Sequence, residues 1–273
     1  MAISSAGIGS GLDVNNIVTQ LMALERRPLT VLDTREAKYQ AQLTAYGSLK
    51  GALSSFQSAV AALANPAKFS AVTANVADTT VATATATSAA KAGSYAVKVT
   101  TLAQAHKLKS GTFAATSTTV GSGTLTIQFG TYSGGVFTLN ADKATGVVTI
   151  DSSQSSLAGV RDAINTANVG VSASIINDGT GNQLVVASKD SGIANSLKIT
   201  VADADLGNTD MAGLSQLAYN PAAVVGSGKN LTETVAAQNA AVVIDGISIS
   251  KASNTLTDAI EGVTLNLLKV NDP

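Results

Sequence analysis

The chain has 273 residues with 17 Lys and Arg against 18 Asp and Glu, which excludes the strongly basic surface that nucleic acids and anionic membranes attract. It has no Cys, which excludes disulfides and thiolate metal sites, and only 4% aromatic residues, which leaves few anchors for a small ligand. This composition, dominated by Ala, Thr, Ser, Gly and Val, favours a structural protein over an enzyme.

Residues 1–11 are small, polar and Gly-rich, and we expect them to be disordered. They lack the basic start and apolar core of a cleaved secretory signal, and no apolar run in the chain is long enough to span a bilayer. Gly7, Gly9 and Gly11 superficially resemble a phosphate loop, but no strand precedes them and no Gly-Lys-Ser/Thr ending follows. A flexible tether is the better interpretation.

Residues 12–66 carry apolar side chains at helical spacing and predict two helices. Asp13 is the expected N-cap of the first, and one stripe follows it: Val14, Ile17, Val18, Leu21 and Met22. Pro28 is expected to stop this helix and start the next, because proline has no N–H and fixes φ. The sequence therefore predicts a helical hairpin.

The second helix is expected to run from Pro28 to about Ala64. Its stripe steps by three and four as in a coiled coil, and two steps of three around Gly47 favour a hairpin or bundle over a long supercoil. So narrow a stripe needs a partner, which identical subunits or a return helix beyond Pro273 would supply. The alternative is that the helix packs on its own globular domain.

From Phe69 onward the apolar period is two, which predicts strands. They are expected near residues 81–87, 95–99, 125–129, 136–139, 147–150, 169–176, 183–187, 197–201, 242–249 and 263–267. Short helices are expected from Leu157, near residues 211–217 and over residues 256–260. A Thr-, Ser- and Gly-rich connection at residues 112–123 marks a candidate domain boundary, and period two returns near residue 232.

Few residues in the chain are candidates for catalysis or metal binding. The sole histidine, His106, lies beside Lys107 and Lys109 on a predicted strand, where we expect a solvated side chain rather than a catalytic base. An acidic loop could gather oxygens around Ca²⁺, but its spacing departs from the EF-hand loop, so an acidic surface loop is favoured; its residues are Asp203, Asp205, Asn208 and Asp210. We predict no catalytic residue, no cofactor and no metal site.

Several segments, in order along the chain, resemble the bacterial flagellar filament cap family, also called flagellar hook-associated protein 2. Gly7–Val14, with Pro28-Leu29, resembles its N-terminus, and Gly93-Ser94-Tyr95, with Leu102 to Ala105, its first sheet segment. Leu157 to Ser188 resembles a module shared by hook-associated proteins and some flagellins. Ser253 to Leu265 resembles the start of the family's C-terminal region, which normally continues into further helices.

The resemblance implies an α+β protein: a helical hairpin or coiled-coil leg, then two β-rich head domains, the outer one inserted into the inner one. The implied divisions are a terminal segment (1–11), the leg (12–66), the discontinuous inner domain (67–119 and 232–273) and the outer domain (120–231). It further implies export through the flagellar export apparatus without a cleaved signal, and a homo-oligomeric cap at the extracellular tip of the flagellum. There it would help flagellin fold into place and prevent monomer loss, beside the hook-associated junction proteins.

The apolar stripe of residues 12–66 and the family resemblance together indicate which residues are candidates for assembly contacts. Filament contact is expected at Ile8, Leu12, Val14, Ile17 and Leu21. The helical bundle is expected to use Leu29, Leu32, Leu43, Leu49, Leu53, Phe56, Val60 and Leu63. Two alternatives stay open: a hook–filament junction or flagellin-like subunit, and a surface adhesin that binds host glycan through its outer domain.

Overall fold

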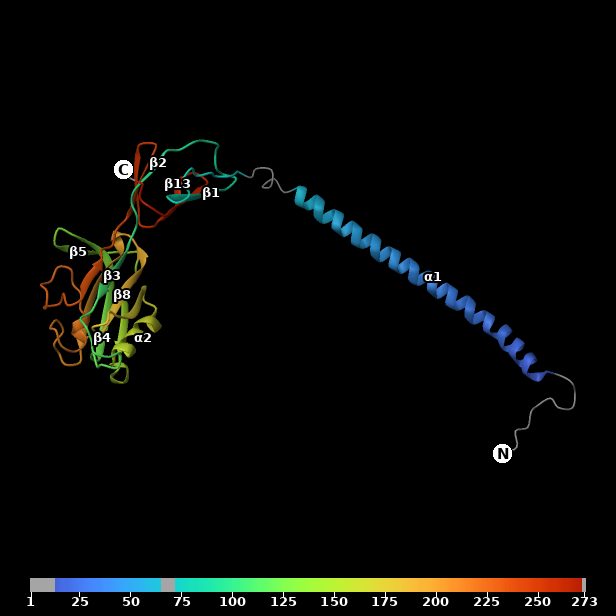
Figure 1. Ribbon diagram of the computed structural model, residues 1–273, viewed down its shortest axis with the longest axis horizontal. Helices are drawn as coiled ribbons and strands as arrows, with labels where there is room; N and C mark the ends of the chain where they lie inside the picture. The colour runs from blue at the N-terminus through green and yellow to red at the C-terminus, as the bar shows by residue number, and fades with distance from the viewer. Residues whose placement is uncertain (1–12, 65–71, 272–273) are drawn as a thin grey trace, which may run out of the picture. The chain divides into compact units, whose positions relative to one another are not determined.

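The structure is a computed structural model that describes residues 13–64 and 72–271. These residues form an α+β protein, with one long helix and a separate compact body that begins near residue 71 (Figure 1). The helices are α1 (Val14–Leu63) and α2 (Leu157–Ala167), with short 3₁₀ turns η2 (Ser152–Gln154), η3 (Ile193–Asn195) and η4 (Gly213–Leu217). The strands are β1 (Ala82–Ala86), β2 (Val97–Thr101), β3 (Ala105–Lys109), β4 (Gly123–Ser133), β5 (Val136–Leu139), β6 (Gly146–Ile150), β7 (Val171–Asn177), β8 (Asn182–Ser191), β9 (Ser196–Asp203), β10 (Thr232–Val235), β11 (Ala240–Ile244), β12 (Ile247–Lys251), β13 (Thr255–Ile260) and β14 (Val263–Leu267).

Helix α1 is continuous, so the predicted break at Pro28 is wrong (Figure 1). Proline removes the one N–H that would bond the carbonyl of Leu24, but its fixed φ suits a helix, and the nearby sequence has no Gly or Asn to end one. The Thr30 hydroxyl donates to the Arg26 carbonyl at 3.2 Å, within the same turn. The N-cap prediction is confirmed, since Asp13 Oδ1 accepts the Asn16 N–H at 3.0 Å. The tether predicted for residues 1–11 lies outside the described residues.

The larger part of the body contains two antiparallel sheets. One has the order β10-β3-β8-β7. In the other, the long strand β4 pairs along one edge with β5 and β6 and along the opposite edge with β9. Most of these strands match the period-two prediction, and β5 matches it residue for residue.

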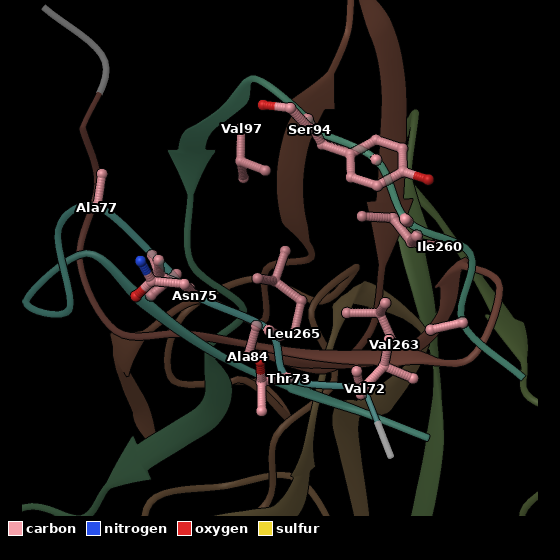
Figure 2. A pocket seen from close by; sticks show the side chains of 18 of the residues that line it. Val72, Thr73, Asn75, Ala77, Ala84, Ser94, Val97, Ile260, Val263 and Leu265 are labelled. Atoms are coloured by element: carbon pink, nitrogen blue, oxygen red, sulfur yellow. The ribbon is translucent and has the colours of Figure 1, made fainter. Parts of the chain in front are cut away.

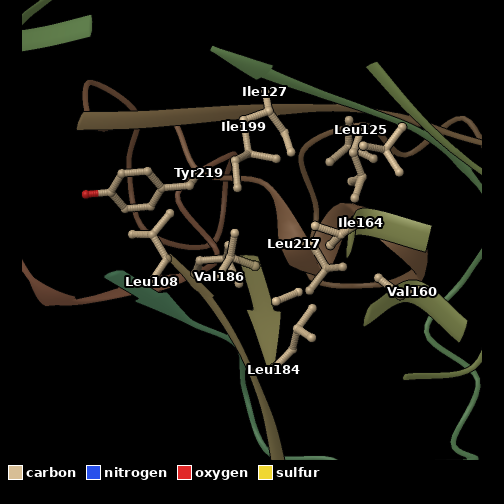
Figure 3. Close-up of a cluster of buried hydrophobic side chains, with 14 of the residues drawn as sticks. Leu108, Leu125, Ile127, Val160, Ile164, Leu184, Val186, Ile199, Leu217 and Tyr219 are labelled. Atoms are coloured by element: carbon tan, nitrogen blue, oxygen red, sulfur yellow. The ribbon is translucent and has the colours of Figure 1, made fainter. Parts of the chain in front are cut away.

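Side chains from both sheets and from α2 meet in one hydrophobic core (Figure 3). Alternate residues of each strand point inward, as Leu125 and Ile127 do on β4 and Leu184 and Val186 on β8. Leu108 on β3 joins them, so the chain enters this core before residue 112. The apolar period of two therefore becomes a sandwich closed by a helix.

Helix α2 covers this core as predicted from its stripe. Leu157, Val160 and Ile164 are all buried. The Ser156 hydroxyl caps the helix by accepting the Gly159 N–H at 3.1 Å. Gly159 is required there, because a Cβ at this position would collide with the carbonyl of Gln154.

A second, smaller core lies between two three-stranded sheets, ordered β1-β14-β13 and β12-β11-β2. It joins residues far apart in sequence, for example Val99 on β2, Val242 on β11 and Leu265 on β14. Ala82, Ala103 and Ala240 contribute to it, so its side chains are light. The two sheets thus combine a segment before the larger core with a segment after it.

The short helix predicted over residues 256–260 is wrong: these residues lie in β13. Leu256 pairs with Leu265 and Ile260 pairs with Val263. Between these two pairs the chain advances four positions along β13 but only two along β14, so the pairing is irregular. Leu256 and Ile260 lie four positions apart in the sequence, which fits one turn of a helix and also places two residues on one face of a strand. Near residues 211–217, where one turn of helix was expected, the structure has the 3₁₀ turn η4.

Candidate assembly surfaces

The apolar stripe of α1 is longer than its sequence prediction, because the helix continues through Pro28. From Val18 to Tyr46 the seam positions follow one another at alternating steps of four and three residues, for example Val18, Met22, Leu29 and Leu32. Two seam positions in this range are occupied by Glu25 and Glu36 instead of apolar residues. After Tyr46 a step of three to Leu49 interrupts the repeat, which then resumes to Leu63. One seam therefore serves the whole helix, and a partner that follows it must wind around α1.

Every large apolar side chain of this seam is exposed. The exposed fractions range from 48% for Val60 to 76% for Leu43, and α1 has no buried residue. A helix with a continuous apolar stripe ordinarily gains its stability by covering that stripe. In the described part of the chain this seam is the longest run of exposed apolar side chains on one element.

The structure places most of the predicted site residues on α1. Val14, Ile17 and Leu21 lie in its first turns, at the helical spacing of three and four. The bundle residues follow from Leu29 to Leu63 on the same helix and are exposed: Leu29, Leu32, Leu43, Leu49, Leu53, Phe56, Val60 and Leu63. Ile8 and Leu12 lie outside the described residues.

His106 is buried, so the predicted solvated side chain is wrong. Its Nδ1 accepts the Leu197 N–H at 2.9 Å, and its Nε2 lies 2.8 Å from Glu233 Oε2. Because the Leu197 N–H must point at an unprotonated Nδ1, the proton sits on Nε2 and the ring is neutral. The contact with Glu233 is therefore a hydrogen bond rather than an ion pair. Burial lowers the pKa of His106 although Glu233 opposes the shift.

Tyr219 completes this cluster. Its hydroxyl donates to Glu233 Oε2 at 3.2 Å, and its ring lies 5.6 Å from the His106 ring. Burial, with the nearby Glu233 carboxylate, raises the pKa of the Tyr219 hydroxyl. The cluster ties β3, β9 and β10 together, so its role is to hold strands in register.

The acidic loop uses its oxygens internally. Asp203 Oδ2 accepts the Ser215 N–H at 2.8 Å, and Asn208 Oδ1 accepts the Asp203 N–H at 2.8 Å. Asp210 Oδ1 accepts the Ser215 hydroxyl at 2.6 Å, which lowers the pKa of that carboxyl. Across the described residues no group of three or more His, Cys, Asp or Glu is arranged to hold a metal ion. Nor does the described chain include a helix with the length and apolar character to cross a membrane.

A groove of about 590 Å³ opens beside the smaller core (Figure 2). Two extended segments, residues 72–78 and 90–95, line it together with β1, β2 and β14. This groove was not predicted from the sequence. The available signal was the alternation in residues 72–77, Val-Thr-Ala-Asn-Val-Ala, a strand pattern without an obvious partner.

Comparison with known proteins identifies the family. Residues 10–106 match the flagellar hook-associated protein 2 N-terminus, residues 237–273 its C-terminus, and residues 136–190 the flagellin hook IN motif. Flagellar hook-associated protein 2 of Escherichia coli K12 is 40% identical over 261 residues, which are 94% of this chain and 52% of that protein. The chain belongs to the flagellar hook-associated protein 2 family. It spans about half the length of such relatives.

Solved structures agree with the sequence comparison. The D1–D2–D3 domains of the flagellar cap protein of Escherichia coli align with a TM-score of 0.71 at 38% identity, covering 85% of this chain and 60% of that one. The cap protein of Pseudomonas aeruginosa PAO1 aligns with a TM-score of 0.56 at 33% identity, covering 70% and 80%. The family resemblance expected from the sequence is therefore confirmed.

Proposed function

We propose that this protein caps the distal end of a bacterial flagellar filament, where it promotes insertion of flagellin and prevents loss of monomers. The observation that carries the proposal is the match, in chain order and in fold, to flagellar cap proteins. The action is mechanical, and the chain contributes surfaces rather than catalytic groups. The location is extracellular at the flagellar tip, reached through the flagellar export apparatus without a cleaved signal.

The exposed seam of α1 supports an assembly role. We propose that Val14, Ile17 and Leu21 in the first turns of α1 contact the filament, together with Ile8 and Leu12, which come earlier in the sequence. The following residues would pack in a helical bundle with other copies of the protein: Leu29, Leu32, Leu43, Leu49, Leu53, Phe56, Val60 and Leu63. The proposal rests on the exposure of these side chains along one continuous helix. Their burial against a partner would stabilise the complex, because it removes apolar surface from water.

We also propose a domain division for the body. The smaller core, built from β1 and β2 with β11 to β14, forms a discontinuous inner domain. The larger core, from β3 to β10, forms an outer domain inserted into it. Because Leu108 and Phe113 pack in the larger core, the first boundary fits better near residue 104 than at residue 119. The second fits near residue 236, after β10.

Labelling of flagella tests the cap directly. Purified protein carrying a gold tag is incubated with isolated flagella that retain their hooks and lack their own cap, and electron microscopy locates the gold. We expect gold only at the end opposite the hook, and slower loss of flagellin from labelled filaments. Gold along the filament sides, or at the hook-proximal end, would contradict a cap.

A second candidate, a flagellin-like or junction subunit, is favoured by the flagellin hook IN motif at residues 136–190. A flagellin-like subunit would polymerise into filaments when the purified protein is concentrated, and a junction protein would label the hook-proximal end. The hook-associated junction proteins are partners of the cap in the first candidate and functional equivalents in the second. The same micrographs therefore separate the two.

A further inference from the structure

We propose that the corner between β8 and η3, residues 191–195, is a latch that locks the domain of the larger core onto the domain of the smaller core. The latch lies within the body and does not involve α1. The inference rests on the proposed division of the body into two domains and goes beyond the cap function, so the two can fail separately.

A two-stranded ribbon connects the two cores. The chain passes between them once from β2 to β3 and once from β10 to β11. The passing segments pair with each other: the Gln104 N–H donates to the Gln238 carbonyl at 2.8 Å, and the Gln238 N–H donates to the Gln104 carbonyl at 3.1 Å. Such a ribbon can still twist and bend, because rotation about φ and ψ is soft. By itself this connection is a hinge.

The corner attaches the larger-core domain to the smaller-core domain at a further point. The Ile193 N–H donates to Asn239 Oδ1 at 2.9 Å, directly before β11. The Ser191 hydroxyl donates to the Ala252 carbonyl at 2.6 Å, directly after β12. Because β12 lies on the side of β11 away from β2, the attachment at Ala252 lies beside the ribbon and restrains rotation about it.

Gly192 brings the backbones of the two domains into direct contact. Its φ is +97°, a conformation that glycine adopts without strain, and its N–H donates to the Gln104 carbonyl at 3.1 Å. A Cβ at this position would lie 2.5 Å from the Cβ of Ala252 and 2.7 Å from its Cα. Any larger residue at position 192 therefore pushes the corner away from Ala252.

Both sides of the latch are braced by hydrogen bonds of their own. Asn195 Nδ2 donates to the Ser191 carbonyl at 2.6 Å, and the Asn195 N–H donates to the Gly192 carbonyl at 2.9 Å, which fixes the corner. On the other side, Asn239 Nδ2 donates to Ser250 Oγ at 3.1 Å, which holds Oδ1 toward the corner. Little conformational entropy is therefore lost when the two sides meet. A few hydrogen bonds are individually weak, so the latch can open while both cores stay folded.

Distances between two spin labels in the full chain test the proposal. The chain has no Cys, so Thr85→Cys on β1 and Ser174→Cys on β7 create two labelling sites at exposed positions, one in each domain. We expect a narrow distance distribution when the latch is intact. Gly192→Ala and, separately, the double variant Ser191→Ala/Asn239→Ala should at least about double its width, because the domains then rotate about the ribbon.

Gly179→Ala is the matched control. Gly179 has nearly the same φ, +90°, but a Cβ there meets nothing within 4 Å, so the change adds backbone strain without a collision. Its distance distribution should match that of the intact latch. Hydrogen exchange of the Leu184 and Val242 amides checks that both cores stay folded in every variant.

Three results would each overturn the proposal: a broad distribution with the latch intact, equal broadening in Gly179→Ala and Gly192→Ala, or no broadening in the folded double variant. The double variant decides alone if Gly192→Ala does not fold. Gold labelling of filament ends uses the unaltered chain, so it tests the cap independently.

Discussion

Leucines in α1 and leucines in the larger core have the same chemistry and opposite surroundings. Leu43 and Leu53 on α1 expose 76% and 64% of their surface, whereas Leu184 on β8 and Leu214 in η4 expose none. The body therefore contains its own stabilising core. The seam of α1 gains no free energy from burial of its apolar side chains until a second apolar surface covers it. The difference supports the proposal that α1 associates through its seam, whereas the body is stabilised by a core of its own.

Truncating one leucine in each region should give the sharpest contrast. Leu184→Ala should lower the free energy of unfolding of the body by about 2–5 kcal/mol, because it removes buried methyl groups and leaves a cavity. Leu53→Ala should leave that quantity unchanged. Urea denaturation followed by circular dichroism measures both. Equal losses would mean that α1 and the body share one core.

The next largest effect is expected at the histidine cluster. His106→Ala should lower the free energy of unfolding by about 1–3 kcal/mol, because it leaves the buried Leu197 N–H without an acceptor. Glu233→Gln is the matched control. Its side-chain oxygen can still accept from the neutral ring, so it should cost much less. A larger loss for Glu233→Gln than for His106→Ala would show that the ring is charged.

Acidification should weaken the body through the same histidine. The pKa of His106 lies below its ordinary value of 6.5, so between these two values the unfolded chain binds more protons than the folded one. Stability is therefore fully present above about pH 6.5 and falls as the pH drops through the folded pKa. Urea midpoints at pH 7.5, 6.0 and 5.0 follow this loss. His106→Asn, which cannot titrate, should show a flatter profile over this range.

The smallest effect on the body is expected for Pro28→Ala. This change restores a backbone N–H within a helix that is already continuous, so the free energy of unfolding of the body should not change. Hydrogen exchange of the neighbouring α1 amides should become slower, because Ala favours the helix interior by about 3 kcal/mol over Pro. Exchange that stays fast on one side of position 28 would instead indicate two helices.

Much of the body could be predicted because local pattern and final packing agree there. Val242 and Ile244 alternate along β11, and Leu157, Val160 and Ile164 mark the buried face of α2. Secondary-structure predictions were wrong where a single local sequence signal was outweighed by the neighbouring sequence or by strand pairing. Pro28 is a helix breaker in isolation, but a single lost hydrogen bond does not end a long helix. Leu256 and Ile260 lie four positions apart, a spacing that a helix and a strand share, and their pairing with β14 decides between the two.

The candidate surfaces also differ in whether local sequence pattern could predict them. The seam of α1 is a property of one helix, so its residues could be named from spacing alone. Burial of His106 depends on Leu197 and Glu233, which lie 91 and 127 positions away in sequence. The groove likewise needs residues 72–78, β2 and β14 to meet. Contacts of such long sequence separation cannot be predicted from the periodicity of one segment alone, even where a segment such as residues 72–77 alternates.

Sedimentation velocity of the purified chain tests most directly whether the seam of α1 is the assembly surface. The double variant Leu49→Asp/Leu53→Asp places charge on the seam, and Ser48→Asp/Ser55→Asp places equal charge on the opposite, exposed face of the same helix. We predict that the unaltered chain and the serine variant self-associate, while the leucine variant sediments as a monomer with a folded body. Identical sedimentation of all three proteins would contradict the account.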